Sequence, residues 1–331
     1  MKKFILGMLV SLVAIYFTFK KVDWRHLIEA FKSANYFFII PSIALVLFSV
    51  WVRAVRWRYF LNPIKENTAL KNIFSATIIG YMANHIFPLR LGELFRAYTI
   101  GKSENISKSS ALATIMVERI IDIFSLLLIL SLIPFFYIFP DKNIKYFGYI
   151  ILVATVFLLL FLIFLMEKRN FVLLIVRFCF KPFPERWYKK VQQILTSFIQ
   201  GLVILKRSEH YFSITWLTSV IWGMYVVIVY SLFRSFNFIE QYQLSIVTCM
   251  IILVMTGIGI TIPSSPGYIG TFHLLCIQGL AFFSIPKNEA LGYAIVLHGC
   301  WYIPPTLLGL IYFWKENLRF SEVKVIRKTS N

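Results

Sequence analysis

The sequence is poor in charged residues, and above all in acidic ones. Only 15% of its 331 residues are charged, and 15 Asp and Glu residues stand against 34 Lys and Arg residues. Soluble domains carry charge on about a quarter of their residues, so this composition excludes a large soluble enzyme domain. The sequence also lacks Walker A, HExxH and GxSxG patterns and zinc-ligand spacing. We therefore expect no catalytic residues, no nucleotide-driven transport, no metal and no cofactor.

Cysteine is scarce as well, and no two cysteines form a CxxC pair. The four lie in or beside apolar runs, at Cys179, Cys249, Cys276 and Cys300. Cysteines in such positions behave as small hydrophobic packing residues. We predict that all four are reduced and structural.

Apolar residues dominate what remains, at 59% of the chain, and 18% of the residues are aromatic. A helix needs about 20 apolar residues to cross the hydrocarbon core of a membrane. The sequence therefore predicts an all-α polytopic membrane protein with about eight transmembrane helices in a single domain, 1–331. The predicted spans are 4–19, 36–52, 109–134, 147–166, 210–234, 243–262, 270–285 and 290–314. Two more hydrophobic segments, 72–101 and 257–272, are interrupted, as expected of broken or re-entrant helices.

The formal net charge of +19 comes from basic residues that flank the apolar runs. This placement follows the positive-inside rule, so we expect no nucleic-acid partner. Segment 53–71 carries five Lys and Arg residues, 167–209 carries nine and the tail 315–331 carries five. The loops between them carry at most two each, except loop 20–35, which carries four. We predict that both termini and 167–209 lie in the cytoplasm.

The basic stretch 167–209 joins a first half, about 1–134, to a second half, about 147–314. Within it, 183–207 has one apolar and one basic helical face, a pattern typical of a helix in the membrane interface. A simple connector that tethers the halves is the alternative, and the same helix could attract anionic headgroups. The apolar face consists of Phe183, Trp187, Val191, Ile194, Leu195, Phe198 and Leu202, and the other of Arg186, Lys189, Lys190 and Gln193.

A first candidate site lies where the apolar run 73–87 ends. Pro88 and Gly92 break the helix there, and a break at membrane depth is tolerated only where it is buried in protein or lines a cavity. If a helix restarts near Gly92, then Glu93 and Arg96 share a face at i, i+3. An ordinary interfacial loop with a salt bridge is the alternative. The polar residues of this segment are Asn84, Arg90, Glu93 and Arg96.

A second candidate site is the sequence Glu118-Arg119-Ile-Ile-Asp122 inside the predicted span 109–134. Glu118 and Asp122 are four residues apart and line one helical face, and Arg119 can pair with Asp122. Ionisable groups inside a span cost at least a few kcal/mol and normally face the bundle interior. They must therefore pair with one another or with arginines of the first segment. A structural ion-pair staple between helices is the alternative.

A third candidate site is the interrupted stretch 256–273. Pro263 and Pro266-Gly267 break a hydrophobic run, and a new helix is predicted to begin after Gly267. The N-terminus of that helix would present free N–H groups and partial positive charge, which suit a phosphate. A kink needed only for packing is the alternative. The candidate binding residues here are Ser264, Ser265, Gly267, Tyr268, Gly270, Thr271 and His273.

The breaks at 88–93 and 263–270 each follow an apolar helix, one in each half. Paired interrupted helices point to the binding site in transporters built from internal repeats. The sequence thus suggests an internal inverted repeat, although residue identity does not reveal it.

Three ordered motifs carry a family resemblance. They are Asn84-x-x-x-Pro88-x-Arg90-x-Gly92-Glu93-x-x-Arg96, Glu118-Arg119-x-x-Asp122 and Pro263-x-x-Pro266-Gly267-x-x-Gly270. With them the chain resembles, over nearly its whole length, the lysylphosphatidylglycerol synthase transmembrane-region family. That family includes the flippase domain of bacterial multiple-peptide-resistance proteins. The resemblance implies a flippase-like fold in the bacterial or archaeal cytoplasmic membrane, and transfer of a phospholipid or isoprenoid-linked lipid between leaflets.

Two departures from the family affect these expectations. An aminoacyl-transferase domain does not follow the last predicted span, so synthesis of lysyl-lipid is not expected. His273 stands where many relatives carry an acidic residue. If that acid sets substrate charge or proton coupling, the substrate here differs.

The leading hypothesis is a lipid flippase in which Arg90 and Arg96 bind the lipid phosphate. Acidic residues would balance these arginines or contact a cationic headgroup; they are Glu93, Glu118 and Asp122. A membrane-embedded glycosyl- or lipid-transferase is the first alternative, disfavoured by outward loops of about 16 residues or fewer. A non-transporting scaffold for envelope enzymes is the second. The expected partner is a membrane lipid, with a second copy or a separate lipid-modifying enzyme as further candidates.

Overall fold

The computed structural model describes residues 2–20, 22–87, 90–136, 142–180, 210–262 and 264–318, together with the isolated residues 185, 188 and 192. This part of the chain is helical and contains no strand. Pro88, Pro263, nearly all of the interfacial helix predicted at 183–207 and the tail beyond 318 lie outside the described residues.

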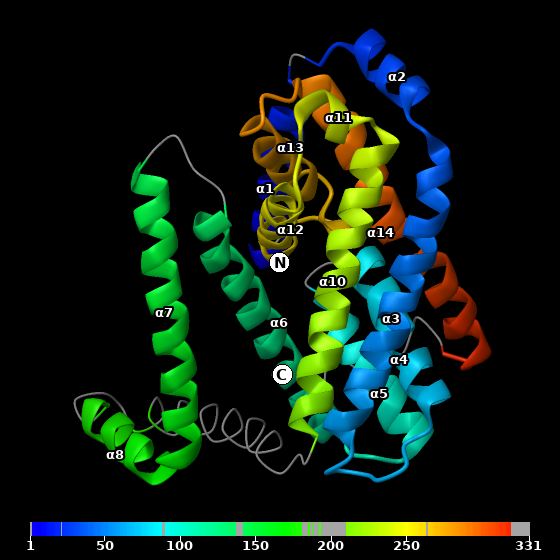
Figure 1. Ribbon diagram of the computed structural model, residues 1–331. Helices are drawn as coiled ribbons and strands as arrows, with labels where there is room; N and C mark the ends of the chain where they lie inside the picture. The colour runs from blue at the N-terminus through cyan, green and yellow to red at the C-terminus, as the bar shows by residue number, and fades with distance from the viewer. Residues whose placement is uncertain are drawn as a thin grey trace.

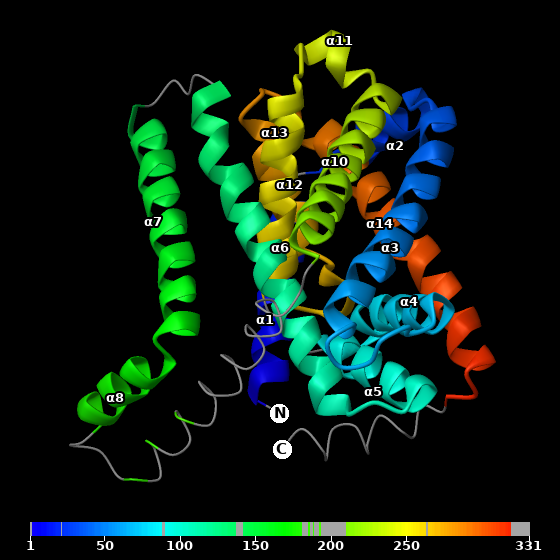
Figure 2. The ribbon, with the colours of Figure 1, turned by 60° about the horizontal axis from the view of Figure 1, so that its bottom comes forward.

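Four helices in the described ranges are long and apolar enough to cross a membrane. They are α3 (Ile39–Leu61, preceded by the 3-10 turn η1, Tyr36–Phe38), α6 (Lys108–Phe136), α10 (Tyr211–Ser235) and α14 (Lys287–Lys315). A helix of 29 residues such as α6 is about 43 Å long, which exceeds the ~30 Å hydrocarbon core. Figures 1 and 2 show these four helices as the frame of the bundle.

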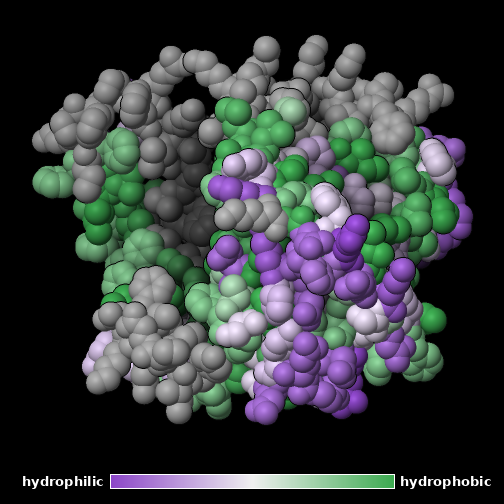
Figure 3. All heavy atoms as spheres, turned by 90° about the horizontal axis from the view of Figure 1, so that it is seen from above, coloured by the Kyte–Doolittle hydropathy of each residue, from purple (hydrophilic) through white to green (hydrophobic). Residues whose placement is uncertain are grey.

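In the described part of the chain, five further helices lie outside this frame and the two hairpins described below. Their bounds are α1 (Lys2–Phe19), α2 (Trp24–Ser33), α7 (Lys142–Glu167), α8 (Arg169–Cys179) and α11 (Phe238–Tyr242). Seen from the end that carries α2 and α11, hydrophilic residues gather on one side of the bundle (Figure 3). At this end the hydroxyl of Tyr242 donates to Glu289. Burial and this hydrogen bond raise the pKa of Tyr242 to about 12.

The interrupted segment 72–101 is a helical hairpin. Its arms are α4 (Leu70–Ile86) and α5 (Gly92–Glu104). The carboxylate of Glu104 accepts hydrogen bonds from the Ala69 N–H at 3.1 Å and from the Asn72 amide at 2.7 Å, so the open ends of the two arms lie together. The segment therefore enters and leaves at the same end of the bundle.

A second hairpin is formed by α12 (Ile246–Thr261) and α13 (Thr271–Ala281), with the 3-10 turn η3 (Pro266–Tyr268) between them. Gly259 packs on the backbone of Thr271 and Phe272, and Gly279 packs on Ile252 and Met255. The structure differs here from the sequence prediction, which made 243–262 and 270–285 two spans. With 11 residues, α13 is about 16 Å long and too short to cross.

The two hairpins approach the middle of the bundle from opposite ends, α4–α5 from the lower end of Figure 1 and α12–α13 from the upper end. Their tips touch, because the Arg90 Nη2 donates to the Ile260 carbonyl oxygen at 2.6 Å. The two halves pack in corresponding ways. The hairpin arm α4 of the first half packs on α14 of the second, and the hairpin arm α12 of the second half packs on α6 of the first. The remaining long helices, α3 and α10, pack on each other. This is the arrangement that two inverted repeats produce.

The two arms of the first hairpin, α4 and α5, approach so closely that position 92 must be glycine. A Cβ there would overlap the carbonyl oxygen of Gly80 on α4 and the side chain of Asn84. We expect Gly92→Val to destabilise the protein by about 1–3 kcal/mol or more, because backbone cannot yield as a side chain does. Gly223→Val on α10 is the matched control, since nothing lies within 4 Å of a Cβ at that position. Thermal unfolding in detergent measures both, and equal midpoints would contradict the close approach.

The Lys/Arg asymmetry also predicts the orientation of this bundle. The start of α6, which contains Ser109, and the short helix α11, which contains Glu240, lie at opposite ends of the bundle (Figure 1). In a cysteine-free background, we expect a membrane-impermeant maleimide to label Glu240→Cys in intact cells. Ser109→Cys should react only after the membrane is opened. The reverse pattern would overturn the predicted cytoplasmic location of both termini.

Candidate functional site

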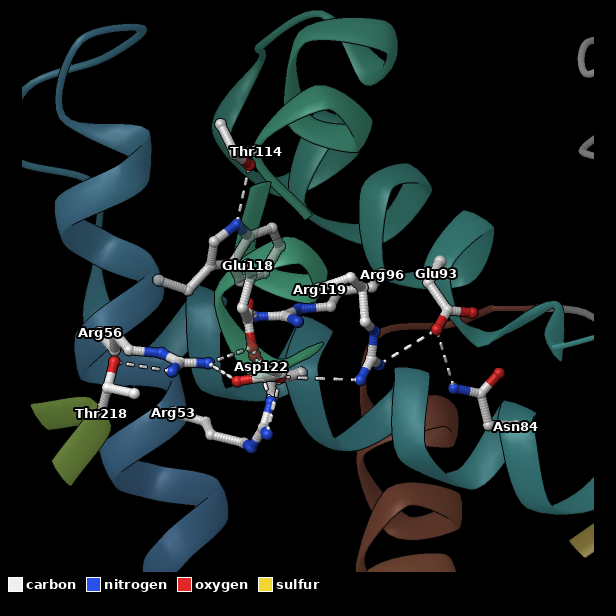
Figure 4. Close-up of polar contacts among 12 residues, drawn as sticks. Arg53, Arg56, Asn84, Glu93, Arg96, Thr114, Glu118, Arg119, Asp122 and Thr218 are labelled. Carbon is white, nitrogen blue, oxygen red and sulfur yellow. Dashed lines mark hydrogen bonds and ion pairs between the residues drawn. The ribbon is translucent and has the colours of Figure 1, made fainter. Parts of the chain in front are cut away.

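A network of buried ion pairs joins α3 to α6 (Figure 4). Arg53 contacts Glu118 and Asp122, each at 2.9 Å. Arg56 contacts the same two carboxylates at 3.2 and 2.8 Å. The side chains of Arg56 and Glu118 are 0% and 1% exposed. Each carboxylate thus serves two arginines from the neighbouring helix.

The first hairpin supplies the rest of the network. Arg96 on α5 forms an ion pair with Glu118 at 2.8 Å, and its guanidinium lies 3.8 Å from the ring centre of Trp57. Arg119 on α6 forms an ion pair with Glu93 at 3.0 Å and a longer one with Asp122 at 3.9 Å. The network therefore ties α3, α5 and α6 together.

The location predicted from the sequence for Arg53 and Arg56 was wrong. Arg53 and Arg56 were counted in a basic cytoplasmic loop, 53–71, after a span ending at residue 52. The helix continues to Leu61, and both side chains are buried. The carboxylates of α6 neutralise them, which lets charged residues continue an apolar helix.

Neutral polar groups supply further hydrogen bonds to the network. The Arg53 Nε donates to the Tyr225 hydroxyl at 2.8 Å, and the Arg56 Nη1 donates to Thr218 at 3.0 Å, both on α10. The Asn84 side-chain oxygen accepts from the Gly92 N–H at 2.8 Å, which fixes the start of α5. Asn84 is therefore a brace of the hairpin tip as well as a neighbour of Glu93.

A cavity of about 200 Å³ lies where the two hairpin tips meet. Its charged lining comes from Arg53, Arg90, Glu93 and Arg119. Its aromatic walls come from Tyr81, Trp222, Tyr225, Tyr268, Phe272, Trp301 and Tyr302. The cavity thus combines three arginines and one carboxylate with aromatic walls.

The predicted site residues of the second hairpin separate into two groups. Gly267 and Tyr268 line the cavity, and both have positive φ, +67° and +61°. The others pack elsewhere: the Ser265 N–H donates to the Ser11 hydroxyl at 2.6 Å, and Gly270 packs on the Ser11 carbonyl. Both contacts tie the tip to α1.

The remaining polar residues of this tip do not line the cavity. The Thr271 hydroxyl donates to that of Ser264 at 3.2 Å, and the ring of His273 lies 4.8 Å from that of His298. The new helix begins at Thr271 and not directly after Gly267, because η3 and the Gly270 residue at φ +96° intervene. Pro266 begins η3, so it belongs to the break as predicted.

Several residues of the site were missed by sequence reasoning. His85 and His298, which were not among the candidate residues, line the cavity beside Tyr302. Arg53 and Arg56 had a signal: two arginines at i, i+3 end one apolar run, while two carboxylates at i, i+4 interrupt another. Tyr225 and Trp301 had none, since aromatic residues occur throughout the chain. Among the described residues, no three His, Cys, Asp or Glu side chains group as a metal site.

In a comparison with known proteins, a family model matches most of this chain. The model of the family described as Lysylphosphatidylglycerol synthase TM region matches residues 4–309. A UPF0104 membrane protein of Methanocaldococcus jannaschii is 23% identical over 92% of this chain and 92% of its own length. Another, from Pyrococcus horikoshii, is 25% identical over 96% of this chain and 98% of its own.

A more partial match is the glycosyltransferase AglD of Haloferax volcanii. It is 24% identical over 36% of this chain, and the match covers 19% of that protein. No solved structure matches the chain. The multi-pass membrane location expected from the sequence agrees with the family and with the apolar helices.

The network makes a strong prediction for Glu118, the carboxylate shared by three arginines. We expect Glu118→Gln to destabilise the folded protein by about 3–5 kcal/mol, because it leaves buried guanidinium groups without compensation. Glu240→Gln, on exposed α11, is the control and should change stability little. Unfolding in a mixed detergent titration measures both. A Glu118→Gln variant as stable as the parent chain would show that the ion pairs are not needed for folding.

Proposed function

The chain belongs to the lysylphosphatidylglycerol synthase transmembrane-region family, and from this premise we propose that it is a lipid translocase of the flippase type. It moves a phospholipid or an isoprenoid-linked lipid between the leaflets of the membrane. The lipid headgroup passes through the cavity between the hairpin tips, while the acyl or isoprenoid tails stay in the bilayer.

One observation carries this proposal: a cationic cavity lies in the bundle interior at the meeting point of two broken helical hairpins. A headgroup that crosses a bilayer needs polar partners at a depth where water is absent. Arginine suits a phosphate, because its planar fork gives charge-assisted hydrogen bonds to two oxygens at once. The aromatic walls of the cavity suit the glycerol or isoprenoid carbons next to the phosphate.

The arginines of the site take different parts. Arg90 and Arg119 line the cavity, whereas Arg96 lies behind it, against Trp57 and Glu118. We therefore assign headgroup binding to Arg90 and Arg119. Arg96, which the sequence pattern ranked with Arg90, holds Glu118 in position.

Arginine rather than a helix terminus holds the headgroup in this proposal. The first turn of α13 abuts Gly259 of α12, with the Phe272 nitrogen and Thr271 carbonyl close to where a Cβ would stand. Tyr268, from the same tip, faces the Arg90 guanidinium at 5.6 Å from its ring centre. The second hairpin thus contributes a ring and a carbonyl acceptor that orient Arg90.

The inverted packing of the two hairpins supports alternating access. In such folds one repeat rocks against the other around a fixed midplane site. Arg90 bridges the two tips through Ile260, so this contact must break or re-form when the tips separate. A phosphate that competes for Arg90 would couple its own entry to that movement.

The alternatives have less support. In a transferase a carboxylate acts on the substrate, but Glu118 and Asp122 are each bound by two or more arginines, and one oxygen of Glu93 is bound by Arg119. The match to the Haloferax glycosyltransferase covers only 19% of that protein, so it gives little support to a transferase function here. A scaffold would have no use for a cationic cavity.

The proposal predicts that the headgroup arginines are needed for transport. In proteoliposomes, we expect Arg90→Ala and Arg119→Ala each to slow leaflet-to-leaflet transfer of a fluorescent phospholipid by at least about ten-fold, equivalent to about 1.4 kcal/mol. Arg58→Ala, on the exposed face of α3, is the control and should retain the parent rate. Full transfer by a double Arg90→Ala, Arg119→Ala variant would rule the proposal out.

A further inference from the structure

The charges around the cavity do not balance. The cavity and the ion-pair network behind it contain five arginines and three acidic residues, and of these Arg53, Arg90, Arg119 and Glu93 line the cavity. The arginines are Arg53, Arg56, Arg90, Arg96 and Arg119, and the acids are Glu93, Glu118 and Asp122. Two positive charges are therefore uncompensated by carboxylates of the described chain. A charge in a membrane interior costs at least about 2.5–3.5 kcal/mol, so such an excess calls for a counter-charge.

The excess charge faces the cavity. Arg56 and Arg96 are enclosed by Glu118, Asp122 and Trp57, with side chains 0% and 6% exposed. Arg119, by contrast, is 35% exposed. Among the described residues Arg90 forms no ion pair, and its partners are the Ile260 carbonyl and the Tyr268 ring.

The cavity offers little to a positively charged headgroup. Glu93 is the one carboxylate among its lining residues. One oxygen of Glu93 already contacts Arg119 at 3.0 Å and lies 3.5 Å from the Asn84 amide. A lysyl or other cationic group would meet Arg90, which has no ion pair among the described residues, and Arg119, whose ion-pair partner is this same Glu93.

We propose that the lipid carried by this chain has a dianionic phosphomonoester headgroup. The inference rests on the proposed translocase function and narrows its substrate class. A phosphomonoester carries about −1.5 to −2 charge at pH 7 on three oxygens, which matches the net excess of positive charge in this group of residues. Arg90 and Arg119 present that excess to the cavity. A phosphodiester carries one charge, and a zwitterionic or aminoacylated headgroup carries none or a positive one. Isoprenyl monophosphates and phosphatidic acid share the matching chemistry.

Binding to the full-length protein in nanodiscs tests this inference. Trp222 and Trp301 line the cavity and provide a fluorescence signal. The probes are farnesyl phosphate, phosphatidic acid, phosphatidylglycerol, phosphatidylethanolamine and inorganic phosphate. We expect both lipid monoesters to bind at least about ten-fold more tightly than phosphatidylglycerol, equivalent to about 1.4 kcal/mol. Their advantage should shrink below pH 6, as the second phosphate proton is taken up.

Variants connect the preference to the arginines. Arg90→Gln and Arg119→Gln should each reduce the advantage of the monoesters over phosphatidylglycerol, while Arg58→Gln should leave it intact. Equal affinity for farnesyl phosphate and phosphatidic acid would mean that the cavity recognises the phosphate and not the lipid attached to it. A difference between them would assign the lipid to the isoprenoid or the glycerolipid class. Inorganic phosphate bound as tightly as the lipids would overturn a lipid headgroup site.

The two proposals fail in different ways. Tight monoester binding without leaflet-to-leaflet transfer in the same vesicles would refute the translocase and leave the charge class intact. Transfer of phosphatidylglycerol or phosphatidylethanolamine as fast as the monoesters, with equal affinity, would refute the charge class and leave the translocase intact.

Discussion

The neutralisation of two carboxylates inside an apolar helix is the constraint on which the structure depends. Glu118 and Asp122 lie on one face of α6, and each needs cationic partners because an unpaired charge in the membrane interior is costly. Arg53 and Arg56 supply those partners from α3, and Arg96 supplies another from α5. Since three separate elements must converge to satisfy this pair, the network fixes the first half of the bundle and with it one wall of the cavity.

The second constraint is that broken backbone at membrane depth must find partners within the protein. The two hairpins satisfy it by meeting tip to tip. Close approach within the first hairpin depends on Gly80 and Gly92, and in the second on Gly259 and Gly279. The cavity lies between the opposed tips, and part of each tip lines it: Arg90 in the first, and Gly267 and Tyr268 in the second.

The charge of the cavity and its position inside the bundle indicate what it can bind. The family and its archaeal relatives identify a membrane protein, at 23–25% identity for the two full-length relatives described above. Three arginines and one carboxylate line the cavity, which favours an anion over a cation. A mobile counter-charge would balance this excess.

The sequence by itself determined the helical membrane class, the two interruptions and most of the charged residues, because hydropathy and helical spacing are local properties. Asn84, Arg90, Glu93 and Arg119 were identified in this way, and the structure brings them to one cavity with Gly267 and Tyr268. Only the tertiary structure decided that 243–262 and 270–285 form one hairpin. It alone showed that Arg53 and Arg56 are buried partners of α6, and that Arg96 lies behind the site. Spacing along a chain reveals which charges need partners, but the choice of partner depends on helices far apart in sequence that meet only on folding.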